Sequence, residues 1–422
     1  MSRVKYFDNL LYFLISSVIF ITAGNFIEDY KKLIFLKLII IFLILSKIDF
    51  IKETKSVLKK NRTISIILIL FIISVTFSFI TSPSKIHQFA FQWLRIRYLD
   101  TITDIFFFIF LYLYFKDRII NYDSLVKSVI FPGLTFSIFV IYIFISNKGL
   151  SHSNKEIIFF DGVRMVGMLV TFLVAFYLGC LHSTLKEKKI LNLLILTTFI
   201  TLAILLMGRG TIIAILATYF FVCIILFLNK EKFKNELLIF ISSFFLSILI
   251  AQIIFQIILP PDEFIFFSKS KHGLFYAFDR INLWKYGYII FLENPYFGKG
   301  PGGFAIAAYN DFYAQKSYGD LLITNYLTHN HPHNFIIQFI VEWGIVGTSL
   351  IFILLIRLSI ISLKYFFKFK INHLLISGVS IIGLASHGLV DGALYHATFT
   401  FYFVLSLSIL CSELSKINNY KS

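Results

Sequence analysis

Residues 236–259 read ELLIFISSFFLSILIAQIIFQIIL, and no charged side chain follows Glu236 within this stretch. A helix of about 20 mostly apolar residues crosses the roughly 30 Å hydrocarbon core of a bilayer. In lipid, such a helix also satisfies its own backbone hydrogen bonds, which a lone strand does not. The stretch therefore predicts a transmembrane helix.

Similar apolar stretches recur along the whole chain. Its 422 residues are 58% hydrophobic and 15% charged, whereas a soluble domain is roughly 45–50% apolar and about 25% charged. This composition excludes a disordered chain, a secreted disulfide scaffold and a cytosolic enzyme. The sequence predicts an all-α, polytopic membrane protein with about 12 transmembrane helices, centred on residues 10–26, 33–47, 63–81, 101–115, 125–146, 163–181, 190–207, 210–228, 236–259, 335–362, 374–391 and 396–413.

The distribution of positive charge predicts the orientation. With the N-terminus inside, the inner segments contain more than twice as many Lys and Arg residues as the short outer loops. Because basic residues favour the cytoplasmic side, we expect both termini to be cytoplasmic. We attribute the net charge of +16 to this topology and not to nucleic-acid binding. On the outer side, Arg95 and Arg97 are interpreted as exposed residues of an interfacial helix that anchors to the membrane.

One outer loop, residues 260–333, is far longer than the others. Structureless loops beyond about 15 residues are uncommon and usually functional. We expect this loop to fold, with helices at 280–293 and 309–327. The predicted organisation is transmembrane helices 1–9 in residues 1–259, a loop domain in 260–333, and transmembrane helices 10–12 in 334–422.

Two arginines are candidate anion-binding residues on the outer side. Arg209 lies in Leu206-Met-Gly-Arg-Gly210, between two apolar runs, and Arg280 begins a helix-like stretch of the large loop. An Arg at membrane depth costs at least about 2.5–3.5 kcal/mol, so Arg209 requires the interface or an anionic partner. The alternatives are a snorkelling Arg209 and a solvated Arg280.

The segment from Thr328 to Asn334 reads THNHPHN and contains three of the ten histidines, His329, His331 and His333. Histidines at this spacing can bind a metal, but no Cys or carboxylate cluster accompanies them. The segment can also form an Asn-assisted cap of the following helix. A general base is the third interpretation, because the unperturbed pKa of His is about 6.5.

Two further features lie on the outer side. Asp391 precedes Gly392 in the hairpin between the last two spans, where an Asp-Gly turn is the simple interpretation. Residues 298–303 read GKGPGG and match the pattern G-x-G-x-x-G. Because no strand precedes this segment and it contains Pro301, we interpret it as a tight turn against the membrane surface and not as a nucleotide site.

Together, Arg209, Arg280, the histidines and Asp391 converge on the outer leaflet. Paired arginines are suited to a diphosphate, which they grip through charge-assisted, often bidentate bonds. A nearby His can take a proton from an attacking hydroxyl. This set of residues fits glycosyl transfer from a lipid diphosphate without a metal or another cofactor. An Asp-x-Asp motif, expected of a metal-dependent transferase, is absent from the outer loops.

Several segments resemble the signature region of the O-antigen ligase and polymerase superfamily. They are Arg280-Ile-Asn-Leu-Trp284, Glu293-Asn-Pro-Tyr-Phe-Gly-Lys-Gly300, Gly303-Phe304, His331-Pro-His-Asn334 and Glu342-Trp-Gly-Ile-Val-Gly347. The resemblance covers residues 280–350. The sequence Gly208-Arg209-Gly210 is similar to another element of the superfamily, which usually has Ser before Arg-Gly.

The resemblance implies a membrane transferase of GT-C type in the bacterial inner membrane, with twelve spans and a periplasmic loop over the active site. Such enzymes transfer a glycan from undecaprenyl diphosphate; the ligases pass O-antigen to a sugar hydroxyl of the lipid A core, with inversion and without metal. By the same resemblance, Arg209 and Arg280 bind the diphosphate. His333, favoured over His331 because Asn334 follows it, is the catalytic base. Asp391, Asn334 and Glu342 have supporting roles.

O-antigen ligase is the leading hypothesis. Polymerases of the same pathway tend to have two sizeable outer loops, and protein O-oligosaccharyltransferases usually have a longer C-terminal part. A glycan transporter would place ionisable residues near the bilayer midplane and show two related halves. The expected partners are the lipid-linked O-antigen, the lipid A core, the membrane, and a chain-length regulator or polymerase.

Overall fold

The computed structural model describes residues 3–21, 26–50, 52–53, 55, 62–82, 88–146, 163–183, 189–206, 208–228, 234–258, 273–308, 331–369, 373–392 and 396–419. Within these ranges every long element is a helix, which confirms the all-α class. The helices are α1 (Arg3–Ile21), α2 (Phe26–Leu45), α4 (Arg62–Thr81), α5 (Gln88–Phe115), α6 (Tyr122–Ser146), α7 (Val163–Ser183), α8 (Lys189–Leu205), α9 (Arg209–Leu228), α10 (Lys234–Ile258), α11 (Gly273–Glu293), α14 (Phe335–Phe369), α15 (His373–Asp391) and α16 (Ala397–Asn419).

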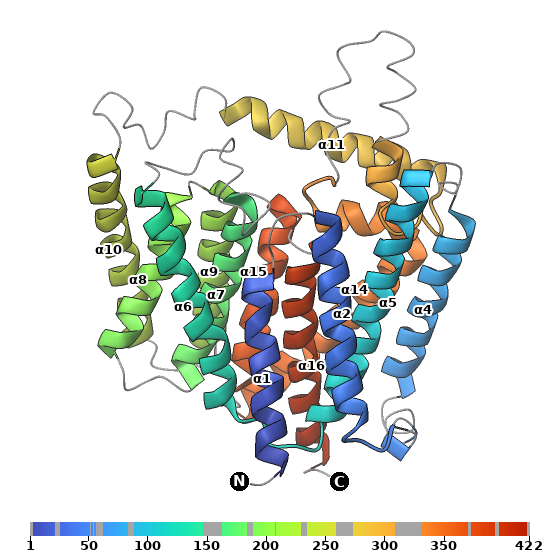
Figure 1. Ribbon diagram of the computed structural model, residues 1–422, viewed down its shortest axis with the longest axis horizontal. Helices are drawn as coiled ribbons and strands as arrows, with labels where there is room; N and C mark the ends of the chain where they lie inside the picture. The colour runs from blue at the N-terminus through green and yellow to red at the C-terminus, as the bar shows by residue number, and fades with distance from the viewer. Residues whose placement is uncertain are drawn as a thin grey trace.

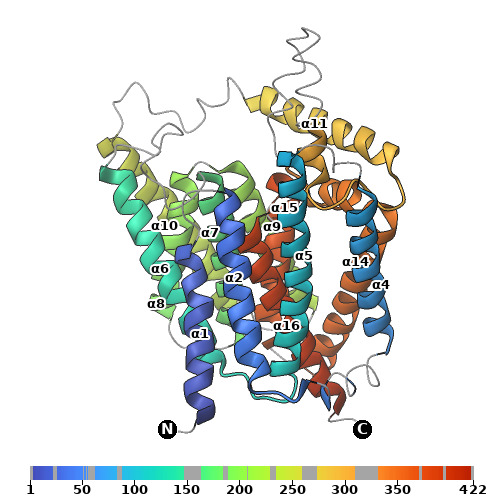
Figure 2. The same cartoon turned by 45° about the vertical axis from the view of Figure 1, so that its right-hand side comes forward.

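The helices form a bundle in which successive members run up and down, and the N- and C-terminal ends lie at the same end of it (Figure 1). Helix α11 lies across the opposite end in both views (Figures 1 and 2). A helix overlaps each of the twelve predicted spans. Seven helices of the described part are long and apolar enough to cross a membrane. The protein is therefore a multi-pass membrane protein, and the number twelve stays a prediction.

Burial divides the bundle into central and peripheral helices. Residues 166–181 of α7 are all buried, and almost all of α16 is buried as well. Helices α9 and α10 are mostly not buried, and each has many exposed apolar side chains. A helix that is apolar all round belongs in a protein interior or in lipid. Helices α7 and α16 therefore form the core of the bundle, and α9 and α10 lie at its periphery. Helix α15 packs against α7, α9, α14 and α16.

The prediction for the start of the fourth span was wrong. Residues 88–115 form one continuous helix, α5, instead of an interfacial helix followed by a short span. Arg95 is exposed as expected, but Arg97 is only 5% exposed. The reason is helical geometry, because Arg97 falls on the face of α5 that also carries Asp100 and Asp104, one and two turns further on. Of the two predicted helices in the long loop, α11 contains residues 280–293, whereas 309–327 lie outside the described residues.

Candidate active site

Three of the predicted site residues meet at one carboxylate. Asp391 is the last residue of α15, and its Oδ1 lies 2.9 Å from Nδ1 of His333 and 3.3 Å from Nη2 of Arg280. The side chains of His333 and Asp391 are 6% and 9% exposed, whereas that of Arg280 is 32% exposed. Residues 58 and 111 positions apart in sequence thus form one cluster, with its arginine nearest the surface.

The contact with Asp391 defines the chemistry of the His333 ring. A ring nitrogen that donates to a carboxylate carries the hydrogen, so in the neutral imidazole the lone pair lies on Nε2. The carboxylate also orients the ring and stabilises the imidazolium that forms after proton uptake. The pair is therefore equipped for general-base chemistry at Nε2.

Backbone geometry brings the His-Pro-His segment against the end of α15. His333 has φ of 52°, and it is the one non-glycine residue of the described part with positive φ. Such a conformation costs about 1–3 kcal/mol and persists where the surroundings enforce it. Gly392 ends α15 with φ of 67°, as glycine often does after a helix. A Cβ at Gly392 would lie 2.8 Å from Nδ1 of His331, so only glycine permits this approach.

Asn334 is the N-cap of α14. Its Oδ1 accepts hydrogen bonds from the backbone N–H groups of Ile336 at 2.9 Å and Ile337 at 3.2 Å. Its Nδ2 donates to the carbonyl of Leu389 at 3.1 Å. The cap interpretation of the segment is thus observed at Asn334. The cap also fixes the residue that follows His333 to the last turn of α15.

A hydrogen bond from α11 completes this arrangement. Nε1 of Trp284, one turn beyond Arg280, donates to the carbonyl of Pro332 at 3.0 Å. The helix that carries Arg280 is therefore attached to the segment that carries His333. The sequence shows the Arg-x-x-x-Trp spacing, but only the fold shows which carbonyl the indole binds.

Two further histidines adjoin the cluster and were not predicted. The ring of His396 lies edge-on to that of His331, with centroids 5.4 Å apart. Burial lowers the pKa of His396 to about 3, so it is neutral at physiological pH. His387 lies 2.7 Å from the hydroxyl of Thr171 through its Nδ1. His396 follows the Asp-Gly turn closely in the sequence, and this position could have identified it as a further candidate site residue.

The other predicted residues lie as follows. His331 accepts the backbone N–H of His333 on its Nδ1 at 3.2 Å. Arg209 is the first residue of α9, directly before Gly210. A Cβ at Gly210 would lie 3.7 Å from Cβ of Asp391, so the backbone at Arg209 adjoins the cluster. The side chain of Arg209, like all of His329, lies outside the described residues.

Glu342 lies apart from this cluster and belongs to a second contact region, between α14 and the loop after α11. It is fully buried, and its Oε1 accepts the N–H of Gly302 at 2.8 Å. The segment 295–300 hydrogen-bonds along residues 341–346 of α14. Gly344 breaks α14 there with φ of 61°. The turn predicted at 298–303 therefore fills the break in α14.

The comparison with protein families matches residues 193–352 to the model described as O-Antigen ligase. The match supports membership in the O-antigen ligase and polymerase superfamily. The matched region includes Arg209, Arg280, the two histidines of the His-Pro-His segment and Glu342, and ends before α15. Comparison with curated proteins gives no significant match. The matched family implies a glycosyltransferase-type activity in O-antigen assembly, with a lipid-linked polysaccharide as substrate.

Within the described ranges, no group of three or more His, Cys, Asp and Glu side chains is placed to hold a metal ion. The chemistry that the cluster supports is that of its own residues, a base oriented by a carboxylate beside an arginine.

Proposed function

We propose that the protein is an O-antigen ligase of the bacterial inner membrane. It transfers O-antigen polysaccharide from undecaprenyl diphosphate to a sugar hydroxyl of the lipid A core. In this proposal the cluster at the α11 end of the bundle faces the periplasm and both termini are cytoplasmic. A chain-length regulator or a polymerase acts with it on the same carrier-linked glycan.

The reaction is a single displacement with inversion. The acceptor oxygen forms a bond to the anomeric carbon while the bond from that carbon to the diphosphate oxygen breaks. The electron pair leaves with the diphosphate, and the hydroxyl proton moves to Nε2 of His333. Arg280 and Arg209 pair with the departing diphosphate, where negative charge grows in the transition state. Asp391 stabilises the imidazolium.

The observation that supports this proposal is the shared Oδ1 of Asp391, 2.9 Å from His333 and 3.3 Å from Arg280. A base and an arginine held on one carboxylate are close enough to act on the two ends of one glycosidic bond. Arg280, about a third exposed, is the member that an arriving diphosphate meets first. Diphosphate binding then competes with Asp391 for its guanidinium.

The decisive experiment is a lipopolysaccharide gel of a deletion strain, run beside an assay of the glycan left on the undecaprenyl carrier. A ligase leaves core without O-units and full-length polymer on the carrier. Wild-type protein restores the ladder, and a His333→Ala protein present at the same level does not.

Two other results would contradict the proposal. Core capped by single O-units would identify a polymerase, the alternative within the superfamily. An unchanged ladder would indicate another acceptor or transport of the carrier-linked glycan.

A further inference from the structure

A second group of buried charges lies deeper in the bundle and takes no part in the proposed reaction. Lys37 of α2 bridges two carboxylates of α5, with Nζ 2.8 Å from Oδ1 of Asp100 and 2.6 Å from Oδ1 of Asp104. Arg97 lies 3.4 Å from Oδ2 of Asp100 and 3.8 Å from Oε2 of Glu342. We call these five residues the α5 charge cluster.

All members of the α5 charge cluster are at most 7% exposed. The cluster contains two basic groups, Lys37 and Arg97, and three carboxyl groups. If all five were ionised, it would have a net charge of −1 in the interior of a membrane protein. An uncompensated charge there is costly, and buried groups neutralise instead. One further positive charge is therefore needed.

The contacts show which carboxyl group is least compensated. Asp100 has a cation at each oxygen. Glu342 accepts the Gly302 N–H and the side-chain amide of Gln338, and Arg97 faces its other oxygen. Asp104 has one ion-pair partner in the described part, Lys37, which it shares with Asp100.

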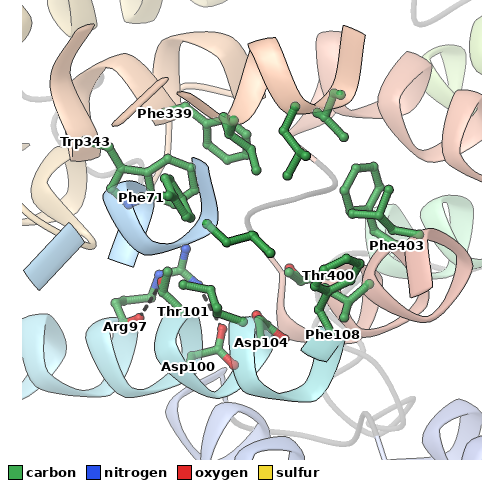
Figure 3. Close-up of a pocket in the computed structure, with 17 residues that line it drawn as sticks. Phe71, Arg97, Asp100, Thr101, Asp104, Phe108, Phe339, Trp343, Thr400 and Phe403 are labelled. Carbon is green, nitrogen blue, oxygen red and sulfur yellow. Dashed lines mark hydrogen bonds and ion pairs between the residues drawn. The ribbon is translucent and has the colours of Figure 1, made fainter. Parts of the chain in front are cut away.

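Asp104 also borders a cavity of about 120 Å³ between α4, α5, α14 and α16 (Figure 3). Apolar side chains, among them Phe71, Phe108 and Phe403, form most of its wall, and Arg97, Asp100, Thr101 and Thr400 are its other polar lining residues. The indole N–H of Trp343, also in the wall, has no hydrogen-bond partner among the described residues. The wall is otherwise apolar, and its polar lining residues lie with Asp104 at one side of the cavity. The cavity is large enough to admit water beside this polar group.

We propose that Asp104 carries a proton in the folded protein, which makes the α5 charge cluster an intramembrane proton-binding site. With Asp104 neutral, two basic groups balance Asp100 and Glu342. The other charges of the cluster are Lys37 from α2, which pairs with Asp104, Arg97 and Asp100 from α5, and Glu342 from α14, which faces Arg97. The residues of α4 and α16 that share its cavity are uncharged. This inference does not depend on the identity of the glycan substrate.

Infrared spectroscopy of the purified protein tests the proposal, because a protonated carboxyl absorbs apart from a carboxylate. The wild type shows one protonated carboxyl near neutral pH, and Asp104→Asn removes it. Asp100→Asn also removes it, because two basic groups then face two carboxylates and Asp104 ionises. The exposed Asp123 is the matched control, since Asp123→Asn leaves the band unchanged. No band in the wild type, or a band that persists in either cluster variant, would overturn the proposal.

Thermal unfolding gives a second readout. Asn resembles a neutral Asp and needs no proton uptake on folding, so Asp104→Asn keeps or raises the melting temperature of the wild type. Asp100→Asn lowers it by removing the anion that both cations share. Raising the pH until Asp104 ionises lowers the melting temperature of the wild type but not of Asp104→Asn. A large destabilisation by Asp104→Asn at neutral pH would show that Asp104 is ionised and pairs with Lys37, which would contradict the proposal.

Discussion

In the proposed mechanism His333 is the base, and Asp391 orients its ring. Removing the base costs about 10²–10⁴-fold in rate for general-base catalysis. We therefore expect His333→Ala to lower the turnover of carrier-linked glycan by about 10²-fold or more, with little change in KM. The measurement is initial-rate kinetics in proteoliposomes. His331→Ala is the comparison variant, and an equal or larger loss there would make His331 the base.

In the proposed mechanism Arg280 contributes charge that matters most in the transition state. Loss of one such donor costs roughly 10²–10³-fold in kcat, so Arg280→Ala should reduce turnover by about 10²-fold or more. Arg95→Ala is the comparison variant, because Arg95 is an exposed arginine of α5 that the proposed mechanism does not use. Wild-type turnover in an Arg280→Ala protein that reaches the membrane would remove Arg280 from the mechanism.

His396 makes stability depend on pH. Burial lowers its pKa to about 3 in the folded protein, whereas an unfolded His titrates near about 6.5. Between these values the unfolded chain binds a proton that the folded chain does not. Stability is therefore complete above about 6.5 and falls as the pH decreases toward 3.

The measurement is the melting temperature of the wild type and of His396→Gln over this pH range. The comparison separates the titration of His396 from that of its neighbours, because the variant keeps the nearby charged and titratable groups, Asp391, His333, Arg97 and His387. The variant should lose stability less steeply. If the melting temperature fell equally steeply with pH in both proteins, His396 would not be the source of the acid sensitivity.

Among the secondary-structure elements, the segment 295–300 connects the end of α11 to α14 through backbone hydrogen bonds at the break in α14. A Cβ at Gly344 would lie 2.4 Å from the backbone of Tyr296, and φ there is +61°. The backbone strain alone costs about 1–3 kcal/mol. We expect Gly344→Ala to lower the melting temperature and the yield of folded protein.

Gly378 in α15 is the matched control for Gly344→Ala. No atom lies within 4 Å of a Cβ placed at Gly378, and Ala in a helix is favoured over Gly by about 1 kcal/mol. Gly378→Ala should leave the melting temperature unchanged or raise it. If both substitutions had the same effect, the close approach at Gly344 would not matter for stability.

At the scale of the whole molecule, the up-and-down order of the helices predicts which residues share a side of the membrane. Thr81, the last residue of α4, is exposed on the periplasmic side of the proposed topology, and Ile119, 98% exposed, lies on the cytoplasmic side. A membrane-impermeant maleimide applied from outside should modify Thr81→Cys and not Ile119→Cys. The reverse pattern would invert the proposed orientation.

The sequence by itself determined the helical class, the position of nearly every helix, and the end of the bundle where the polar residues gather. These properties follow from local hydropathy and from the order of spans, which need no knowledge of packing. The resemblance to the superfamily could also be recognised from sequence motifs. Two glycines of these motifs, Gly298 and Gly344, occur where two backbone segments touch.

Only the tertiary structure shows which side chains contact one another. The sequence does not show that Arg97 is buried against Glu342, that His396 adjoins His331, or that Arg280 and His333 share one oxygen of Asp391. Each of these contacts joins residues far apart in the chain, and the direction in which a helix turns its polar face depends on its neighbours. Hydropathy reports how apolar a helix is, whereas ion pairing in the interior depends on which helices pack together.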